Sequence, residues 1–290
     1  MTTIRLGSHD EDVIVLQRLL SLLGFSVVND CIFGNGTLAA VQTFQSQNSL
    51  TADGIVGPNT WNALFFNSFA ADDVLEGLDI SHHNADEGGP VDFDFIADNY
   101  WFCFVKSTEG ATVQDPMFLD NFKALRDRHI LRGAYYFFRM MNPDIQGQIN
   151  NFLNAGIDYR QKGILPPVLD VEPSLNEFKN TAALTASKND IVARMHTWLN
   201  AVEAKTGKTP IIYTSRHIWD DILKSPTGFE RYPLWVASYS DTATQPNMPF
   251  NWKNYIMWQY TENGSVNGKS GFDVNRLNIS FPQLLKMGGF

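Results

Sequence analysis

The chain of 290 residues is long enough for one large domain or for two unequal ones. Hydrophobic residues make up 44% of it and charged residues 18%, a globular balance that excludes a disordered or low-complexity protein. With 22 basic and 31 acidic residues the formal charge is −9, and no basic face is clustered, so we predict no nucleic-acid partner. No apolar run approaches the roughly 20 residues of a membrane-spanning helix, so we predict no membrane span.

Residues 1–66 show the pattern of a small helical domain. Apolar residues recur at helical spacing from Val13 to Leu23, after an acidic stretch and before a glycine. A second helix is predicted from about Gly36 and a third from Pro58, because proline is favoured at the first helical position. A core of this size favours a module that mainly binds. Residues 67–76 are predicted to be a short linker.

From residue 77 onward, short apolar runs alternate with amphipathic helical stretches. Such alternation implies a parallel sheet, and this many repeats in one unit favour a barrel. The last three apolar runs are separated by segments without a helical period. We therefore predict an α/β fold, in which residues 77–290 form an irregular (β/α) barrel of eight strands with helices mainly in the first five units, preceded by the small three-helix domain. The predicted strands are Gly77–Ser81, Trp101–Lys106, Arg132–Phe138, Leu165–Glu172, Pro210–Thr214, Pro233–Tyr239, Tyr255–Tyr260 and Phe272–Val274.

The run from Pro167 to Glu172 carries the strongest chemical signal. Side chains alternate between the two faces of a strand, so Asp170 and Glu172 share one face. If the apolar residues between them pack under the helices, both carboxyls face the barrel interior at its C-terminal mouth. Two carboxyls in one pocket repel each other, so the pKa of one rises enough to keep a proton near neutral pH, as acid–base cleavage of a glycosidic bond requires. Solvated acids or a helix cap explain the pair equally well when it is taken alone.

The first and last predicted strands each carry a similar acid, Asp79 and Asp273. The first and last strands of a closed barrel are neighbours, so we expect these two carboxyls to lie close together. Three acid sites on one face of the barrel are much less common by chance than a single one. The candidate catalytic residues are therefore Glu172, Asp170, Asp79 and Asp273.

Aromatic residues accompany these acids along the predicted strands. Aromatic rings stack on sugars, and a phenol or an amide can hold an acetamido group or position a water molecule. Taken singly, each ring is better explained by core packing, because alternation turns about half of them outward. Lys106 and Glu109 fit an ion pair at the rim better than a substrate contact. The candidate substrate-binding residues are Tyr135, Tyr136, Tyr213, Trp235, Tyr239, Trp258 and Gln259.

The sequence offers no motif for a metal or a cofactor. His82 and His83 are adjacent, and adjacent side chains on an extended chain point to opposite faces, so we predict no metal site there. Neither Cys31 nor Cys103 has the spacing of a metal ligand, and we expect no disulfide between them. A Gly-x-Ser-x-Gly elbow, a P-loop and a dinucleotide fingerprint are all missing from the sequence, so we predict no cofactor.

Residues 77–280 resemble the glycoside hydrolase family 25 muramidases, the Chalaropsis-type lysozymes. The matching elements occur in the order of the family. One departure is Tyr136, because family members commonly carry His there, and it concerns one sugar contact rather than the chemistry. The matching elements are Gly77–Ser81, Val91–Phe93, Phe104–Gly110, Gly133–Phe137, Asp170–Glu172, Tyr213–Thr214, Leu234–Ala237, Trp258–Tyr260 and Phe272–Asn275.

Residues 4–65 resemble the three-helix peptidoglycan-binding domain found beside many cell-wall hydrolases. Cys31 stands where that family usually has a glycine after the aspartate of its first turn, so we expect the turn to be retained with some strain. The matching elements are Val15–Leu20, Leu23–Gly24, Phe33–Gly34, Thr37, Ala40–Val41, Phe44–Gln45, Leu50, Asp53–Gly54, Val56–Gly57 and Thr60–Trp61.

The resemblance to family 25 implies a role for each of the four acids. Glu172 would be the general acid that protonates the leaving glycosidic oxygen. Asp170 would be the partner carboxylate, either attacking the anomeric carbon or orienting the substrate's own 2-acetamido group to attack it. Asp79 and Asp273 would hold the sugar and tune Glu172.

Together these observations predict a lysozyme, an N-acetylmuramidase that hydrolyses the β-1,4 bond between N-acetylmuramic acid and N-acetylglucosamine. The N-terminal domain would hold the enzyme on peptidoglycan glycan strands. Two alternatives remain open. One is a catalytically inactive peptidoglycan-binding protein, and the other is a different barrel glycosidase such as a chitinase-like enzyme.

The N-terminus lacks the apolar segment of a signal peptide. We therefore predict synthesis in the cytoplasm and action on the cell wall or in the periplasm after export, injection or lysis. A phage endolysin and an injected antibacterial effector both fit. Their partners would be a holin in the first case, and a secretion machine or an immunity protein in the second.

Overall fold

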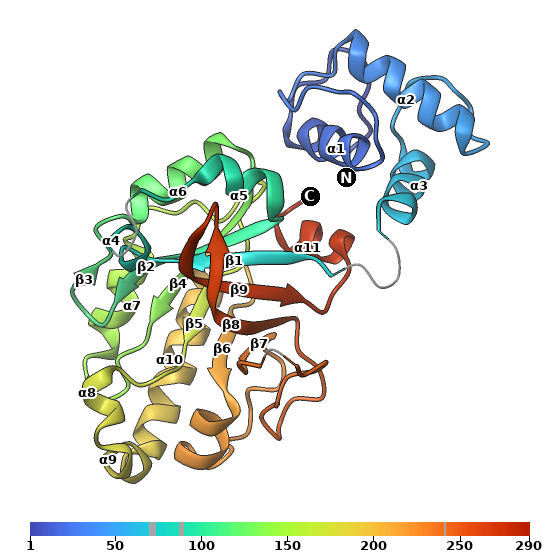
Figure 1. The fold of residues 1–290 in the computed structure, drawn as a ribbon. Helices are drawn as coiled ribbons and strands as arrows, with labels where there is room; N and C mark the ends of the chain where they lie inside the picture. Colours follow the sequence, from blue (N-terminus) through green and yellow to red (C-terminus); the bar gives the residue numbers. More distant parts are fainter. Residues whose placement is uncertain (70–73, 87–89, 241) are drawn as a thin grey trace. The chain divides into compact units, whose positions relative to one another are not determined.

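The computed structural model describes residues 1–69, 74–86, 90–240 and 242–290, without the side chains of residues 85 and 86. The chain divides into two compact units (Figure 1). None of the described helices is both long enough and apolar enough to cross a bilayer. The predicted linker, residues 67–76, includes residues 70–73, which lie outside the described part of the chain. The first unit comprises Met1–Val74, Phe281–Lys286 and Phe290, and the second comprises Leu75–Ser280 and Met287–Gly289.

The first unit contains the three predicted helices, α1 (Glu11–Leu22), α2 (Asn35–Gln47) and α3 (Pro58–Ser68). The Asp10 side chain caps α1 by accepting a hydrogen bond from a backbone N–H of its first turn. Apolar residues on the inner faces of the helices are buried, and the C-terminal helix α11 (Phe281–Met287) contributes buried apolar side chains. The apolar periodicity of the sequence therefore places these helices correctly.

Two buried glutamines fix the turns before α2 and α3 in the same way. Gln17 Oε1 accepts a hydrogen bond from the Cys31 N–H (3.0 Å), and Gln45 Oε1 accepts one from the Gly54 N–H (2.9 Å). Each glutamine Nε2 also donates to the aspartate that begins its turn. The φ angles are +61° at Cys31 and +72° at Gly54, in the left-handed region that favours glycine. The turn at Cys31 is therefore retained in a strained conformation, as predicted.

Substitutions at Cys31 and Gly54 should change the stability of the protein in opposite directions. Cys31→Gly removes a Cβ from a left-handed conformation and should raise the free energy of unfolding by up to about 1 kcal/mol. Gly54→Ala should lower it by at least about 1 kcal/mol, because the new Cβ would also lie 2.3 Å from Leu38 Cδ1. Calorimetry of the full chain measures both effects. Cys31→Ala keeps the Cβ and controls for loss of the thiol. A Cys31→Gly variant less stable than the parent contradicts strain at this turn.

The second unit is a closed barrel (Figure 1), and its described residues form eight barrel strands and one additional short strand. The strand order in the sheet is β1-β9-β8-β7-β6-β5-β4-β2-β3, and β1 also pairs with β2, which closes the ring and leaves β3 outside it. The predicted barrel is therefore confirmed. The strands are β1 (Glu76–Ile80), β2 (Phe102–Glu109), β3 (Val113–Gln114), β4 (Leu131–Phe137), β5 (Val168–Asp170), β6 (Ile211–Ser215), β7 (Leu234–Ala237), β8 (Met257–Val266) and β9 (Lys269–Leu277).

The last strand departs from the parallel sheet that the alternating pattern predicts. The barrel strands from β1 to β8 pair in parallel, whereas β9 runs antiparallel to both β8 and β1. Asn267 and Gly268, both with positive φ, form the tight turn between β8 and β9. A hairpin joins neighbouring strands without a crossover helix, which explains why the sequence before Phe272 lacks a helical period.

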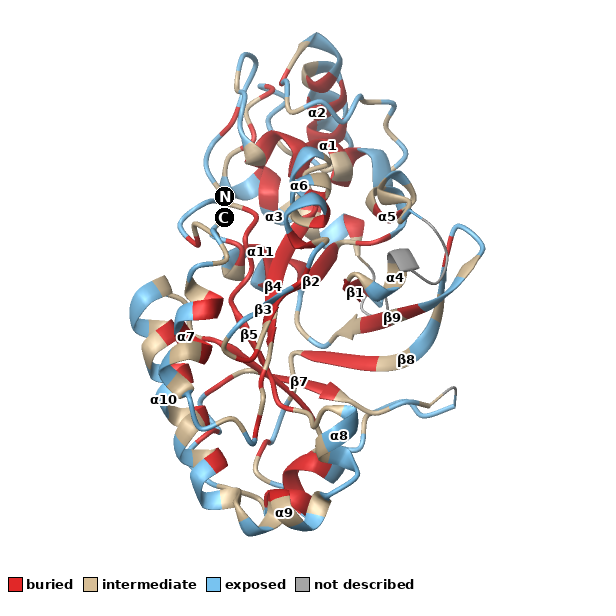
Figure 2. Cartoon of the chain, turned by 90° about the vertical axis from the view of Figure 1, so that its left-hand side faces the viewer, coloured by how far each residue is buried: buried red, intermediate tan, exposed pale blue. Residues whose placement is uncertain are grey.

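Helices accompany the first five strands of the barrel, as predicted, and become short afterwards. The connection from β7 to β8 has no helix in the residues that the structure describes. Figure 2 shows that α7 and α10 bury one face and expose the other. The helices are α4 (His83–Asp86), α5 (Phe93–Asn99), α6 (Phe118–Asp127), α7 (Ile145–Leu153), α8 (Leu175–Phe178), α9 (Thr181–Ala186), α10 (Lys188–Thr206) and the π-helix η1 (His217–Ile222).

Large aromatic rings fill part of the barrel interior. The Phe102 and Phe104 rings are fully buried, and Phe104 lies against Trp235, with ring centroids 5.0 Å apart. Glycines on the neighbouring strands make room for the phenylalanines, because a Cβ would lie 2.4 Å from the Phe102 ring at Gly77 and 2.2 Å from the Phe104 ring at Gly133. The packed rings confine open space to the mouth of the barrel.

Candidate active site

A cavity of about 260 Å³ lies at the mouth of the barrel. All four predicted catalytic acids line it, and five of the seven predicted substrate-binding residues do so as well. The side chains come from β1, β4, β5, β6, β7, β8 and β9 or from the residues that directly follow these strands. The lining residues are Asp79, Tyr135, Val168, Asp170, Glu172, Tyr213, Trp235, Tyr239, Gln259, Glu262 and Asp273.

The pairing of β1 with β9 brings Asp79 and Asp273 together. The two residues are direct partners in the register of these strands, which confirms the expected proximity. Asp79 Oδ2 accepts hydrogen bonds from Asn275 Nδ2 (2.7 Å) and Gln259 Nε2 (2.9 Å). Asn275 is held in turn by Trp235, whose Nε1 donates to Asn275 Oδ1 (2.7 Å). Asp79 is therefore buried but supplied with donors.

Burial raises the pKa of both aspartates, but to different extents. It raises the pKa of Asp79 to about 6, against the hydrogen bonds from Asn275 and Gln259 that lower it. Burial, followed by the negative charge of Asp79, raises the pKa of Asp273 to about 9. Asp273 is therefore neutral at pH 7, and its hydroxyl can donate to the Asp79 carboxylate.

Gln259 connects the acids to the aromatic side of the cavity. Its Oε1 accepts hydrogen bonds from Tyr213 Oη (2.7 Å) and Tyr239 Oη (2.8 Å), while its Nε2 donates to Asp79. Two donors on the oxygen and one acceptor on the nitrogen fix which way the amide points. Tyr239 is 50% exposed and lines the cavity, so it remains accessible to a ligand although its hydroxyl is engaged.

Asp170 and Glu172 occupy the same cavity in different surroundings. Asp170 is 4% exposed, and its Oδ1 has no hydrogen-bond partner among the described residues. Burial, and then the charge of Glu172, raise the pKa of Asp170 well above its usual range. Glu172 is only half-buried, and burial followed by the charge of Asp79 raises its pKa to about 7. Glu172 can thus hold a proton at neutral pH and pass it to a ligand.

Lys106 and Glu109 form the predicted ion pair, with Nζ 2.7 Å from Oε2. The pair is largely buried rather than on the rim, and Arg139 also pairs with Glu109. The positive charge of Lys106 lowers the pKa of both Asp170 and Glu172, in opposition to burial. Lys106 therefore acts on both acids through its charge without lining the cavity, and the charge of Glu109 raises the pKa of Asp170 in opposition.

Residues 78–269 match the family described as glycosyl hydrolases family 25, over most of the barrel unit. The chain belongs to glycosyl hydrolase family 25. Residues 9–64 match the peptidoglycan binding domain family. Both resemblances that the sequence suggests are confirmed.

Several bacterial proteins are similar to this family 25 chain. YegX of Escherichia coli is 34% identical over 185 residues, which cover 63% of this chain and 61% of YegX. Lysozyme M1 of Streptomyces globisporus is 29% identical over 73% of this chain and 71% of its own length. The crystal structure of the Streptomyces coelicolor lysozyme superposes with a TM-score of 0.66 at 26% identity, covering 75% of this chain and 98% of that one.

Two predicted substrate-binding residues of the family 25 barrel point away from the cavity. Tyr136 is fully buried in the core, where it stacks on Trp198 and its hydroxyl bonds to Gln148. Trp258 is also in the core, and its Nε1 donates to the Ser238 carbonyl oxygen (2.7 Å). Tyr136 follows the cavity residue Tyr135, and Trp258 precedes the cavity residue Gln259. Because successive side chains of a strand point to opposite faces, both rings point outward from the barrel interior. The predicted sugar contacts of Tyr136 and Trp258 are corrected accordingly.

The sequence prediction missed Glu262 and Asn275. Asn275 lies two residues after Asp273 on the same strand, so the alternation that identified Asp273 also indicates Asn275. Glu262 could not be found in this way, because alternation from Gln259 turns it away from the cavity. Its position depends on how β8 pairs with β9.

His82 and His83 do not point to opposite faces, contrary to the prediction. Their ring centroids lie 3.9 Å apart, because the chain turns into α4 here instead of staying extended. His82 Nδ1 lies 2.7 Å from Oδ2 of the buried Asp115, which also accepts from the His82 backbone N–H. That carboxylate holds His82 in place.

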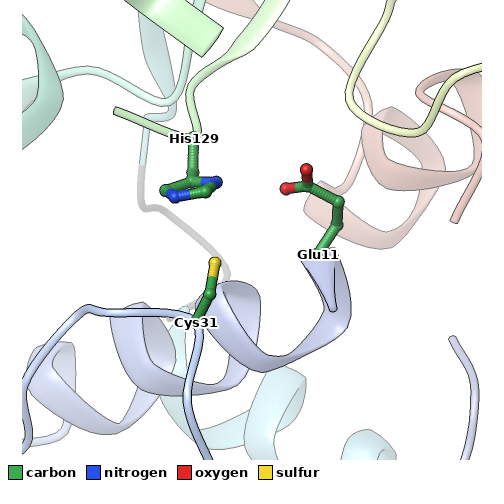
Figure 3. A group of neighbouring side chains, drawn as sticks. All are labelled: Glu11, Cys31 and His129. Atoms are coloured by element: carbon green, nitrogen blue, oxygen red, sulfur yellow. The ribbon is translucent and has the colours of Figure 1, made fainter. Parts of the chain in front are cut away.

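Three residues that can bind metals are drawn in Figure 3. Glu11 and Cys31 belong to the first unit and His129 to the second, so we assign no metal site to them. Cys31 and Cys103, both within the described part of the chain, are not joined by a disulfide.

Proposed function

We propose that this chain is a lysozyme, an N-acetylmuramidase that hydrolyses the β-1,4 bond between N-acetylmuramic acid and N-acetylglucosamine in peptidoglycan. One observation carries the proposal: a half-buried glutamic acid with a pKa of about 7 shares an open cavity with a buried aspartic acid that has an unpartnered oxygen. Relatives named lysozyme M1 and N,O-diacetylmuramidase support it. A catalytically inactive wall-binding protein would not need four acids converging on one cavity.

Glu172 is the general acid in this proposal. Its carboxyl is protonated below about pH 7 and reaches the cavity, so it can transfer the proton to the glycosidic oxygen as the bond to the anomeric carbon breaks. The ionised carboxylate that remains can then accept a proton from the attacking water. One residue therefore serves both steps of a retaining reaction.

Asp170 is better suited to orient the substrate than to attack it. Direct attack on the anomeric carbon needs the ionised carboxylate, whereas burial and Glu172 favour the neutral form of Asp170. An oxygen of Asp170 that carries no proton can still accept a hydrogen bond. We therefore assign the unpartnered oxygen of Asp170 to the N–H of a 2-acetamido group, whose own oxygen then attacks the anomeric carbon.

The first unit would hold the enzyme on its polymeric substrate. Its match to the peptidoglycan binding domain family supports this role. The proposed place of action is the bacterial cell wall or the periplasm, reached by export, injection or lysis. A phage endolysin would work with a holin, whereas an injected effector would work with a secretion machine and an immunity protein.

Glu172→Gln should lower kcat by at least about 100-fold, because an amide cannot give a proton to the leaving oxygen. The variant should fold normally and still bind peptidoglycan. The measurement is the release of reducing ends from purified peptidoglycan, with mass spectrometry of the products. Glu230→Gln, the same change at an exposed residue outside the cavity, is the matched control. Near-parental turnover of Glu172→Gln would refute the acid assignment, and glucosamine at the new reducing ends would indicate a chitinase-like enzyme.

The kcat of the parent should fall as the pH rises through about 7. The active form of Glu172 is the protonated one, and its pKa is raised to about 7, so the proton is held below this pH and lost above it. A pH profile on soluble peptidoglycan fragments measures this alkaline limb. A kcat that keeps rising above pH 8 is incompatible with Glu172 as the acid.

Deleting residues 1–70 should lower activity on whole sacculi by at least about tenfold, because tethering raises the local concentration of substrate. Activity on soluble fragments should change little. The deletion removes Phe65 and Phe69, which contact Phe281 within the first unit, so the thermal stability of the truncated chain must be measured as a control. Equal loss on both substrates would show that the first unit does not act as a tether.

A further inference from the structure

Glu262 lines the cavity, as Gln259 does. The two residues are three positions apart on β8, so regular alternation of side chains between the faces of the strand would turn Glu262 away from the cavity. Five residue steps along β8 correspond to only three along β9 in this part of the hairpin, so β8 contains extra residues. Extra residues of this kind form β-bulges, which redirect side chains and are common beside active sites. The partners in this stretch are Gln259 and Asn275, Thr261 and Val274, and Gly264 and Phe272.

Two local features maintain this irregular pairing. The Asn263 N–H donates to Thr261 Oγ1 (3.1 Å), which closes a small turn around Glu262. Gly264 follows, and a Cβ there would lie 2.1 Å from Val274 Cγ2 and 2.8 Å from the Phe272 carbonyl oxygen. The close approach of the two strands therefore requires glycine, and it fixes the direction of Glu262.

Glu262 adds an unpaired negative charge to the mouth of the cavity. Its side chain is exposed, and the described residues provide it with no hydrogen bond or ion pair. The residues that line the cavity include five acids but no lysine or arginine. Burial and Asp79 account for most of the raised pKa of Glu172, and the charge of Glu262 raises it further. The same charge also raises the pKa of Asp273.

We propose that Glu262 is a positioning residue for the hydrolysis: its carboxylate, turned into the cavity by the bulges of β8, helps to keep the catalytic proton on Glu172. The proposal rests on the proposed function of Glu172 as the general acid. Glu262 acts through Glu172 and touches neither of the reacting atoms.

Glu262 is the most readily changed of the groups around Glu172. The other acids in the set are buried or half-buried, so replacing them would disturb packing as well as charge. Glu262 is exposed, so an isosteric change alters the charge alone. The titratable and charged groups that face Glu172 are Asp79 on β1, Lys106 on β2, Tyr135 on β4, Asp170 on β5, Tyr213 on β6, Tyr239 after β7, Glu262 on β8 and Asp273 on β9.

The test compares the pH dependence of kcat on soluble peptidoglycan fragments for the parent and three variants. Glu262→Gln should shift the alkaline limb of the kcat profile to a pH lower by about half a unit. At pH values above the midpoint of the limb, kcat should therefore be about threefold lower than in the parent, with KM unchanged. Glu262→Asp keeps the charge and should restore the parental limb. Asp98→Asn, the same charge change on the exposed side of α5, should leave the limb in place. The shift should shrink at about 1 M salt, because salt screens exposed charges.

Either an unmoved limb in Glu262→Gln or an equal shift in Asp98→Asn overturns the proposal. A raised KM without a shift in the limb would instead show that Glu262 contacts the substrate. A ¹³C NMR titration of the Glu172 carboxyl without substrate, assigned with Glu172→Gln, separates this proposal from the proposed function. The Glu172 midpoint should fall in Glu262→Gln. If the midpoint falls while the parent does not hydrolyse peptidoglycan, the coupling stands and the proposed function fails.

Discussion

The antiparallel closure of the barrel by β9 is the constraint on which the cavity depends. Asp79 and Asp273 are direct register partners on β1 and β9, so the backbone hydrogen bonds of the sheet hold the two carboxyls side by side in a buried position that disfavours their ionised forms. The same pairing brings Asn275 to Asp79, which keeps that carboxyl supplied with a donor despite its burial. The cavity thus gathers acids whose charges would repel one another if all were ionised, and the hydrogen bonds of the sheet prevent them from separating.

Acids held in this way make the folded state retain protons that the unfolded chain releases. The folded pKa values of Asp79, Glu172 and Asp273, about 6, 7 and 9, all lie above the ordinary values of these side chains. The folded state therefore binds more protons than the unfolded state, and these groups lower stability progressively as the pH rises from about 4 to 9. The raised pKa that lets Glu172 act as an acid near neutral pH is thus inseparable from a stability cost at alkaline pH.

Local patterns in the sequence located the acids but not every neighbour. The period of two along a strand is a property of the chain itself, so it placed Asp170 and Glu172 on one face without knowledge of the fold. The same rule shows that Tyr136 cannot share a face with Tyr135, and applying it strictly would have removed Tyr136 from the candidates. Glu262 was out of reach, because the bulges that redirect it exist only once β8 pairs with β9. The backbone direction at such a position is decided by the partner strand.

The direction of β9 also explains why the donors of the cavity lie deeper than its acids. In the antiparallel pairing, Asp273 is opposite Asp79 while Asn275 is opposite Gly77, two positions further from the mouth. Asn275 can therefore reach Asp79 from within the barrel and bond to the buried Trp235. In a parallel strand the residue two positions after Asp273 would lie nearer the mouth, and the amide would occupy space that the ligand needs. The hairpin of β8 and β9 joins the last two strands without a helix. It thus places the Asn275 amide in the interior, the carboxyls of Asp79 and Asp273 above it, and the open cavity outermost.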